Sequence, residues 1–417
     1  MSAVPSVSPS SPPERPVNIV IFTAAQATSL SGTWMQTTTV GWLSWAMTHS
    51  AAWVGAIAVT QVIAAVVVGP LTGTVVDRHS PYRVIVTTQT LLATNAVVLF
   101  LLASHDALTI WSLLGMAMLD AIVGAMNMPV QTKIIALIAG RERLPQAIAA
   151  NSIAVNLARS TGPAIAGVLL IRNHAALVFG LNAISYLAYL GTAFYLRRWT
   201  DRMPAHHVRR FFADVAAGFR YAAEKREIAL LLMLAVTFAA LARPFIDLLP
   251  AFSGQVFKGG PETLSTLLSA QGVGSLVAAV FLLRRKDTGR LVRRTFVAAI
   301  AMPLLLVVFC TNTYLPLGVG IIALAGAAHV TCNVGMQSMA QLFADDEFRG
   351  RVMALYGLLF RAVPSLGAFV IGLVAQQLGL RALLGGAAAI AVVLILRLRI
   401  AAKTVYASSL NPVADPH

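Results

Sequence analysis

The sequence predicts an all-α membrane protein whose twelve transmembrane helices form two six-helix bundles. Three observations support this fold class. Of the 417 residues, 58% are hydrophobic and only 11% are charged, whereas soluble proteins carry about a quarter charged residues. The apolar residues form long continuous runs, which argues against a barrel of short alternating strands. The longest polar gap divides these runs into six and six.

Each apolar run is long enough to cross a bilayer, which takes roughly 20 residues in a helix. The predicted spans are 18–48, 52–76, 83–104, 108–135, 144–171, 175–196, 228–252, 262–283, 292–311, 315–343, 350–378 and 382–402. They give an N-terminal bundle (18–198), a cytoplasmic linker with an interfacial helix (199–227) and a C-terminal bundle (228–403). A solvated linker helix is the alternative for the helix in 199–227. Residues 1–17, rich in Pro and Ser, are predicted to be a disordered cytoplasmic tail, and 404–417 a second cytoplasmic tail.

Basic residues fix the expected orientation. With alternating sides through twelve spans, almost all of the 31 Lys and Arg residues fall on the side of the N-terminus. The exceptions, on the opposite side or inside spans, are Arg172, Lys258, Arg381, Arg159, Arg243 and Arg361. This bias places both termini in the cytoplasm. The net charge of +15 therefore indicates topology and contact with anionic membrane lipid, not a nucleic-acid partner.

The two halves repeat each other weakly. NMPVQT in 127–132 matches NVGMQS in 333–338, and Arg143 matches Arg349 at the same spacing. A constant spacing through several loops indicates two similar bundles related by an axis along the membrane normal. Such an arrangement places a substrate path between the bundles near the middle of the membrane.

The loop GTVVDRHSPYR, between the second and third spans, resembles a motif of the major facilitator superfamily, G-x-L-a-D-r-x-G-r-k. Gly73, Asp77 and Arg78 occupy matching positions, and Arg83 supplies a late basic residue, but Ser80 replaces the second glycine. The resemblance covers about residues 17–403 and implies the major facilitator fold and transport by alternating access.

We interpret Asp77 as a contact rather than as part of a solvated loop, which is the alternative. Its carboxylate is expected to accept from backbone N–H groups at the start of the eleventh span, near Gly350 and Arg351, where the helix dipole favours an anion. This contact would hold the two bundles together in the outward-facing state.

Two further segments resemble the enterobactin-exporter-like branch, also called transmembrane secretion effectors. STGPAIAG in the fifth span is similar to an antiporter-type signature at Gly162, Pro163 and Gly167. DEFRGR, which contains Arg349, and LNAISYLA in the sixth span are typical of the branch. Gly162 and Pro163 are expected to bend their helix or to let a neighbouring helix approach closely.

Charged residues inside spans are costly and need a partner or water. Asp120, near the middle of the fourth span, is predicted to pair with Arg159 in the fifth and to face the cavity between the bundles. In the sharper hypothesis, Asp120 takes up a proton in one state and frees Arg159 to bind an anionic or polar substrate. A purely structural ion pair is the alternative.

Five more residues are candidates for the substrate or proton pathway. Arg243 and Asp247 are four apart, hence on one helix face, and predict a local ion pair near an outer gate or stabilisation of a helix end. Arg361 is the candidate substrate contact in the second bundle, His329 is a packing residue or a proton carrier, and Gln36 is expected to line the cavity. Weaker candidates are Gln61, Asn127, Asn156, Gln271 and Asn333.

The sequence predicts transport that ATP does not drive. The energy is expected to come from an ion gradient, from the substrate's own gradient or from a partner protein. No G-x-x-x-x-G-K-[ST] loop is present, because none of the five lysines follows a glycine. Neither H-E-x-x-H nor G-x-S-x-G occurs, so the sequence predicts neither an enzyme nor a metal or cofactor.

The resulting prediction is a monomeric secondary transporter of the bacterial inner membrane, exporting a drug, siderophore or metabolite by proton antiport. Alternatives are an importer or uncoupled facilitator of the same fold, and a channel or lipid scramblase.

Overall fold

The computed structural model describes residues 16–68, 79–201, 211–283 and 290–410, and these ranges are helical except for short connections. The helices are α1 (Pro16–Thr48), α2 (Ala51–Ile63), the π-helical turn η1 (Ala64–Val68), α4 (Pro81–Ser104), α5 (Ile110–Ile171), α6 (Ala175–Tyr195), α7 (Arg197–Thr200), α8 (Phe211–Glu224), α9 (Arg226–Leu241), α10 (Pro244–Val256), α11 (Pro261–Leu283), α12 (Leu291–Thr311), α13 (Leu315–Phe343), α14 (Arg349–Leu378) and α15 (Leu380–Leu410).

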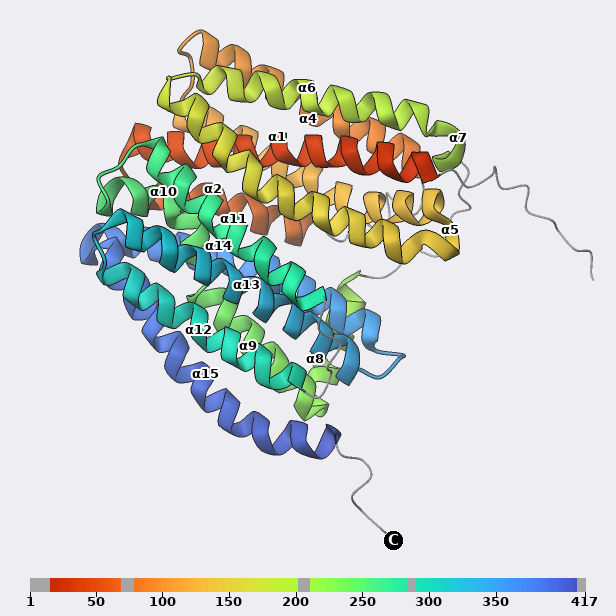
Figure 1. Ribbon diagram of the computed structural model, residues 1–417, viewed down its shortest axis with the longest axis vertical. Coiled ribbons are helices and arrows are strands. Elements are labelled where there is room, and N and C mark those ends of the chain that lie inside the picture. Colours follow the sequence, from red (N-terminus) through yellow and green to blue (C-terminus); the bar gives the residue numbers. More distant parts are fainter. Residues whose placement is uncertain (1–15, 69–78, 202–210, 284–289, 411–417) are drawn as a thin grey trace, which may run out of the picture.

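The helices form two groups in chain order. In Figure 1 the first-half helices, red to yellow-green, occupy the upper part and the second-half helices, green to blue, the lower part. Within the first group α1 packs on α5 and α6, and within the second α13 packs on α11 and α12. The groups are joined mainly by α2 with α14 and α5 with α11, and α10 also contacts α1 and α2. The predicted all-helical, two-bundle fold class is confirmed.

The exact number of spans is not confirmed. Among the described residues, eleven helical segments are long and apolar enough to cross a membrane. The predicted span absent from this set is α1, which is 33 residues long but carries many polar side chains. Several of these are buried inside the first bundle, among them Asn18, Gln26 and Gln36. The polarity of α1 therefore reflects the interior that it faces.

The helices have two notable breaks. One separates two spans within α5, and the other divides the seventh span into two helices. Within α5, Gly140 has φ 63° and ψ 178°, a conformation that suits glycine, and it separates the segments 110–140 and 142–171. The seventh span is divided into α9 and α10 just before Pro244, which has no backbone N–H to continue the helix.

The bundles differ in how their cores are built. The second bundle contains one continuous apolar cluster, to which Trp45 and Val54 of the first half also contribute. Among its described residues, the first bundle has four smaller clusters. Polar contacts run between its helices, such as Gln26 to Gln131 at 3.1 Å and Thr88 to Asn127 at 2.7 Å. The first bundle is thus the more polar of the two inside.

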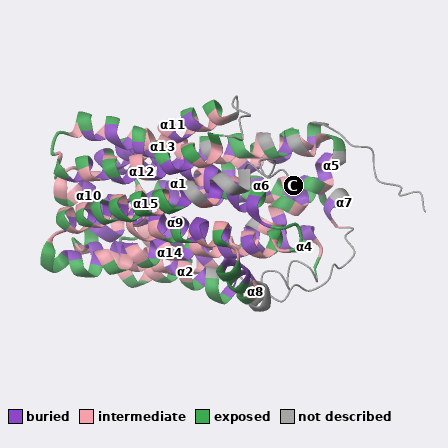
Figure 2. Ribbon diagram, turned by 90° about the horizontal axis from the view of Figure 1, so that it is seen from below, coloured by how far each residue is buried: buried purple, intermediate pink, exposed green. Residues whose placement is uncertain are grey.

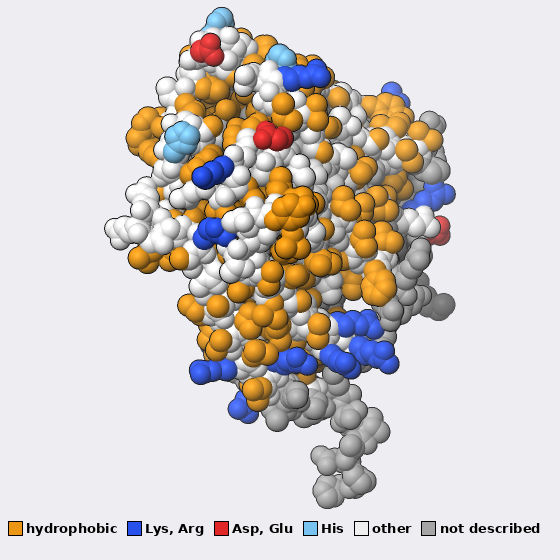
Figure 3. Space-filling view, turned by 60° about the vertical axis from the view of Figure 1, so that its left-hand side comes forward, with side chains coloured by type: hydrophobic (Ala, Val, Ile, Leu, Met, Phe, Trp, Pro, Cys, Tyr) orange, Lys and Arg blue, Asp and Glu red, His pale blue; other side chains and the backbone are white. Residues whose placement is uncertain are grey.

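The outer surface is apolar, as expected for helices in lipid. Figure 2 shows helices with buried and exposed sides, and the exposed sides carry large apolar residues such as Trp111, 68% exposed, and Ile400, 70% exposed. In Figure 3 hydrophobic side chains cover much of the visible face, and Lys and Arg gather along its lower edge. Both cysteines, Cys310 and Cys332, are buried and unpaired.

The bundles touch closely at the end where α1 meets α2 and where α14 ends. A Cβ added to Gly372 would lie 2.5 Å from the carbonyl oxygen of Ala51, and one added to Gly55 would lie 2.8 Å from that of Ala368. The Gln376 side chain also donates to Ser50 Oγ at 2.9 Å. Helices α2 and α14 are therefore held together at this end through positions that only glycine can occupy without displacement.

The predicted linker helix is present as α8, and it docks on the loop between α13 and α14. The Tyr221 ring stacks on Phe348 with centroids 4.4 Å apart, and its hydroxyl donates to Asp345 at 2.8 Å. Lys225 forms an ion pair with the same carboxylate. Hydrogen bonds from Lys225 and Tyr221 hold the pKa of Asp345 below its usual value.

The tails fall only partly within the described ranges. The described part of helix α1 starts at Pro16, and residues 1–15 lie outside the description. Helix α15 continues to Leu410, so the predicted tail 404–417 begins as helix. A helix can extend past the apolar span because the chain needs no apolar residues once it has left the membrane.

Candidate functional site

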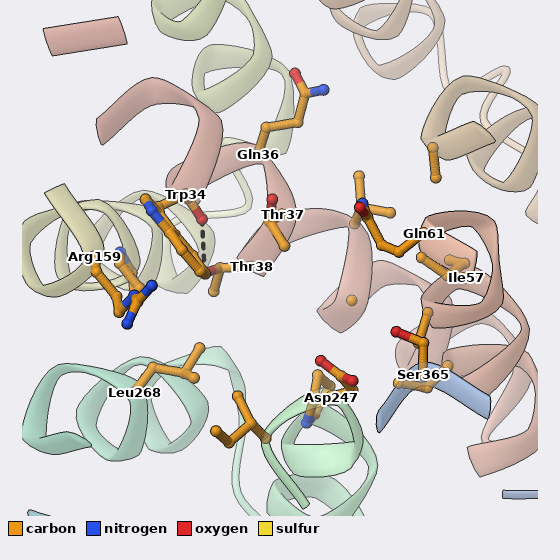
Figure 4. A pocket seen from close by; sticks show the side chains of 18 of the residues that line it. Trp34, Gln36, Thr37, Thr38, Ile57, Gln61, Arg159, Asp247, Leu268 and Ser365 are labelled. Carbon is orange, nitrogen blue, oxygen red and sulfur yellow. Dashed lines mark hydrogen bonds between the residues drawn. The ribbon is translucent and has the colours of Figure 1, made fainter. Parts of the chain in front are cut away.

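A cavity of about 240 Å³ lies between the two bundles. Its walls come from α1, α2 and α5 on one side and from α10, α11, α13 and α14 on the other. Figure 4 shows its centre, with side chains of both halves directed inward. The predicted residues on its walls are Gln36, Asp120, Arg159, Pro163, Arg243, Asp247, Gln61, Gln271, His329 and Asn333.

Arg159 enters the cavity from α5. Its guanidinium lies over the ring of Trp34, 5.2 Å from the centroid, and Figure 4 shows the two side chains against each other. Its buried Nε has no hydrogen-bond partner among the described residues. A guanidinium packed on an indole but not fully hydrogen-bonded is available to a ligand.

Asp120 does not pair with Arg159, so this prediction is wrong. Its carboxylate accepts instead from two neutral amides, Gln36 of α1 and Asn95 of α4, the latter at 2.7 Å. Asn182 of α6 in turn donates to Gln36 at 2.8 Å. The physical reason is that the first half of α5 turns Asp120 toward α1 and α4, whose amides reach it first.

Arg243 and Asp247 lie at the break between α9 and α10. Arg243 donates to the backbone oxygen of Phe360 and stacks on its ring, 4.6 Å from the centroid. Asp247 stands in the first turn of α10, and within the described residues no donor contacts its carboxylate. The predicted contact ion pair is therefore not formed, and the position of Asp247 favours stabilisation of the helix start.

His329 and Arg361 have different positions relative to the cavity. His329 of α13 lines it, is 5% exposed, and packs between Phe238 and Phe360. Arg361 is exposed and is not among the lining residues, whereas the preceding residue, Phe360, is. Consecutive residues of an α-helix are rotated by about 100° about its axis, so Arg361 points away from the cavity wall that Phe360 lines.

The cavity combines opposite charges with apolar walls. Figure 4 shows Arg159 and Asp247 both turned toward the open centre, from α5 and α10, with Leu268 and Ile57 nearby. A guanidinium donates to acidic or polar oxygens, and a carboxylate accepts from hydroxyl or amino groups. This arrangement can orient a molecule that has both polar groups and an apolar body.

The glycines of the predicted antiporter-type signature serve two different interfaces. A Cβ on Gly162 would lie 2.6 Å from Trp34 Cβ, so Gly162 allows α1 to approach α5 within the first bundle. A Cβ on Gly167 would collide with Ser265 of α11, so Gly167 lies at the contact between bundles. Pro163, between them, lines the cavity. The signature therefore contains one residue that lines the cavity and, one helical turn further along, one that contacts the other bundle.

Only part of the loop motif GTVVDRHSPYR lies among the residues that the structure describes. Gly73, Asp77 and Arg78 are outside it, so the contact of Asp77 stays a prediction. Ser80, which replaces the motif's second glycine, accepts from the Arg83 backbone N–H at 3.4 Å as the N-cap of α4. Its hydroxyl also donates to Asp201 at 2.8 Å. The substitution thus starts α4 and ties it to the end of the first bundle.

The basic residues at the start of α14 contact their own loop. Arg349 pairs with Asp346 at 2.5 Å and donates to the Gln341 backbone at 3.0 Å. Arg351 lies over the Phe348 ring, 5.0 Å from the centroid, and Gly350 is exposed beside it. These contacts shape the loop on which α8 docks.

Sequence reasoning missed Asn95 and Asn182, which complete the amide network around Asp120. Each is a single amide within a long apolar run, and that polarity was the available signal. The acceptors that these two amides reach depend on how α4 and α6 pack against α1 and α5, which the sequence does not show.

Two helical bundles around a shared cavity lined by charged and apolar groups define a membrane transporter with the major facilitator fold. The chain belongs to the transmembrane secretion effector family, a branch of this superfamily, whose sequence profile matches residues 7–416. The predicted family is thereby confirmed, as is the prediction that the chain is a transporter and not an enzyme.

Two curated relatives are similar to this chain in sequence, and one solved structure shares its fold. The staphyloferrin A transporter of Staphylococcus aureus (strain NCTC 8325 / PS 47) is 24% identical over 356 residues, 84% of this chain and 87% of the relative. Macrolide efflux protein A of Streptococcus pyogenes is 21% identical over 330 residues, 75% of this chain and 78% of the relative. A POT family transporter in complex with 5-aminolevulinic acid superposes with a TM-score of 0.76 at 10% identity, covering 94% of this chain and 97% of that one.

Proposed function

We propose that this chain exports a small, partly apolar molecule from the cytoplasm in exchange for protons. The observation that carries the proposal is Asp120, a carboxylate on the cavity wall whose donors are both neutral amides. A buried carboxylate that has no cationic partner can change between its charged and neutral forms without leaving a buried cation unpaired. Proton uptake at this position is therefore compatible with the surrounding structure.

Antiport requires that a proton and the substrate exclude each other. An ionised Asp120 accepts a hydrogen bond from a hydroxyl or amino group of the substrate, and protonation weakens that bond. Arg159 and Asp247 would hold other polar groups of the same molecule, while Trp34 and Leu268 would pack on its apolar body. Pockets for drug-sized ligands have volumes of about 300–1,000 Å³, so a cavity of about 240 Å³ favours a small substrate in this conformation.

The orientation follows from the basic side chains. We place the basic ends of the helices, and both termini, in the cytoplasm of a bacterium, with the chain a monomer in the inner membrane. The contacts of Gly55 and Gly372 then lie at the outer side. Alternating access would open these contacts when the cavity faces outward. The relatives named for staphyloferrin A transport and macrolide efflux support a small-molecule substrate.

Over-expression in an efflux-deficient host, screened against a panel of macrolides, siderophores and toxic metabolites, tests the export proposal. We expect a raised minimum inhibitory concentration for at least one compound and no increase for Asp120→Asn. Asp106→Asn, in the exposed loop before α5, is the matched control and is expected to behave as the unaltered chain. A panel without any shift, at verified membrane expression, would contradict export.

A further inference from the structure

A second hollow lies away from the central cavity, on the surface of the second bundle. It has a volume of about 650 Å³ and is formed by α8, α9, α14 and α15. Its walls are apolar except for Thr237 and Arg397. In Figure 1, α8 lies beside α9 in the lower half of the molecule, and α15 forms its lower border. None of the residues used in the proposed transport cycle lines this groove.

The groove has the length of one membrane leaflet. It extends from Phe219 and Ala222 on the interfacial helix α8 down α9 to Thr237. Helix α9 starts at Arg226, so Thr237 lies about 16 Å deeper at 1.5 Å per residue. Half of a hydrocarbon core is about 15 Å. An acyl chain that starts at the level of α8 would therefore fill the groove to its deep end.

The groove carries a positive charge at the height of the lipid headgroups. Arg397 lies five residues before the end of the apolar part of α15, which reaches Ala402, or about 8 Å below it. A long arginine side chain can reach the interface from this depth. Within the described ranges no carboxylate pairs with Arg397, and Arg220 and Arg226 are exposed on the neighbouring helices α8 and α9.

We propose that this groove binds an anionic phospholipid of the cytoplasmic leaflet, with one acyl chain along α9 and the phosphate on Arg397. Apolar walls and a single unpaired guanidinium at one end are complementary to such a molecule. The groove also includes Ala222, one residue from the Tyr221 contact that docks α8. A bound lipid therefore packs against the linker helix as well as against α9 and α15.

Native mass spectrometry of the full-length protein, in micelles containing equal amounts of phosphatidylglycerol and phosphatidylcholine with identical chains, tests the proposal. We expect retained phosphatidylglycerol to exceed phosphatidylcholine. Arg397→Gln should lower this preference about fivefold, as expected for one basic residue near an anionic surface. Arg399→Gln, on the same helix but outside the groove, is the matched control and should keep the preference.

Filling the groove tests the acyl-chain part separately. Ala229→Trp places a large ring in the hollow and should reduce retention of both lipids, whereas Val297→Trp, on the exposed side of α12, should not. Monodispersity and helix content establish that each variant is folded. Equal retention of the two lipids by the unaltered protein, or equal loss in Arg397→Gln and Arg399→Gln, would overturn the proposal. These outcomes do not depend on whether the protein exports anything.

Discussion

Replacing Asp120 by Asn is expected to abolish accumulation of substrate against its gradient while leaving the protein folded. Asn keeps the shape of the side chain and can still accept from Gln36 or Asn95 through its oxygen, with the amides reoriented to match. It cannot bind and release a proton. Downhill movement of substrate should therefore continue, whereas the accumulation ratio in inverted membrane vesicles should fall to about one.

Asp106→Asn provides the control for this experiment, since it removes one carboxylate from an exposed loop. The readout is uptake of a compound identified in the resistance screen, energised by a pH gradient and repeated with a protonophore. A vesicle preparation in which Asp120→Asn still concentrates the compound, and in which the protonophore dissipates that concentration, would place the proton site elsewhere.

Replacing Gly372 by Leu is expected to slow transport about tenfold or more. The Cβ alone would lie 2.5 Å from the Ala51 carbonyl oxygen and 3.3 Å from Ala52 Cα, so α14 and α2 must move apart to accommodate the side chain. Overpacking at such a contact costs roughly 1–3 kcal/mol, and about 1.4 kcal/mol corresponds to tenfold. Because the contact forms between bundles, the cost falls on closure of the outer side.

The matched control is Gly357→Leu, on the same helix, where no heavy atom lies within 4 Å of the added Cβ. Initial rates of export and thermal unfolding in detergent should be measured for both variants. Gly372→Leu should lose rate with little loss of thermal stability, and Gly357→Leu should retain both. Normal export by Gly372→Leu would show that α2 and α14 need not approach as closely during the cycle.

The fold could be predicted because the bilayer imposes a strong and simple pattern. Apolar runs of the required length are visible without knowledge of packing, and the repeat between halves predicts two bundles. Helix α1 shows the limit of this reasoning, because its Gln and Thr residues lower its hydropathy although they face the protein interior. A helix surrounded by other helices need not be apolar.

The candidate site could be predicted in its residue types but not in its contacts. Buried charges in spans are rare enough to indicate function, and Asp120, Arg159, Arg243 and Asp247 all reach one cavity. Their partners depend on helix rotation and packing, which spacing along the chain does not determine. An amide of α1 lies at Asp120 where Arg159 was expected.

Proton movement driven by substrate tests the central claim most directly. Proteoliposomes are loaded with the compound from the resistance screen and with a pH-sensitive dye, and are then diluted into compound-free medium at the same pH. Exchange of substrate for protons predicts that the lumen becomes acidic as the compound leaves through protein oriented to export it, and that Asp120→Asn shows no such change. Efflux of the compound at full rate with constant luminal pH would contradict proton antiport.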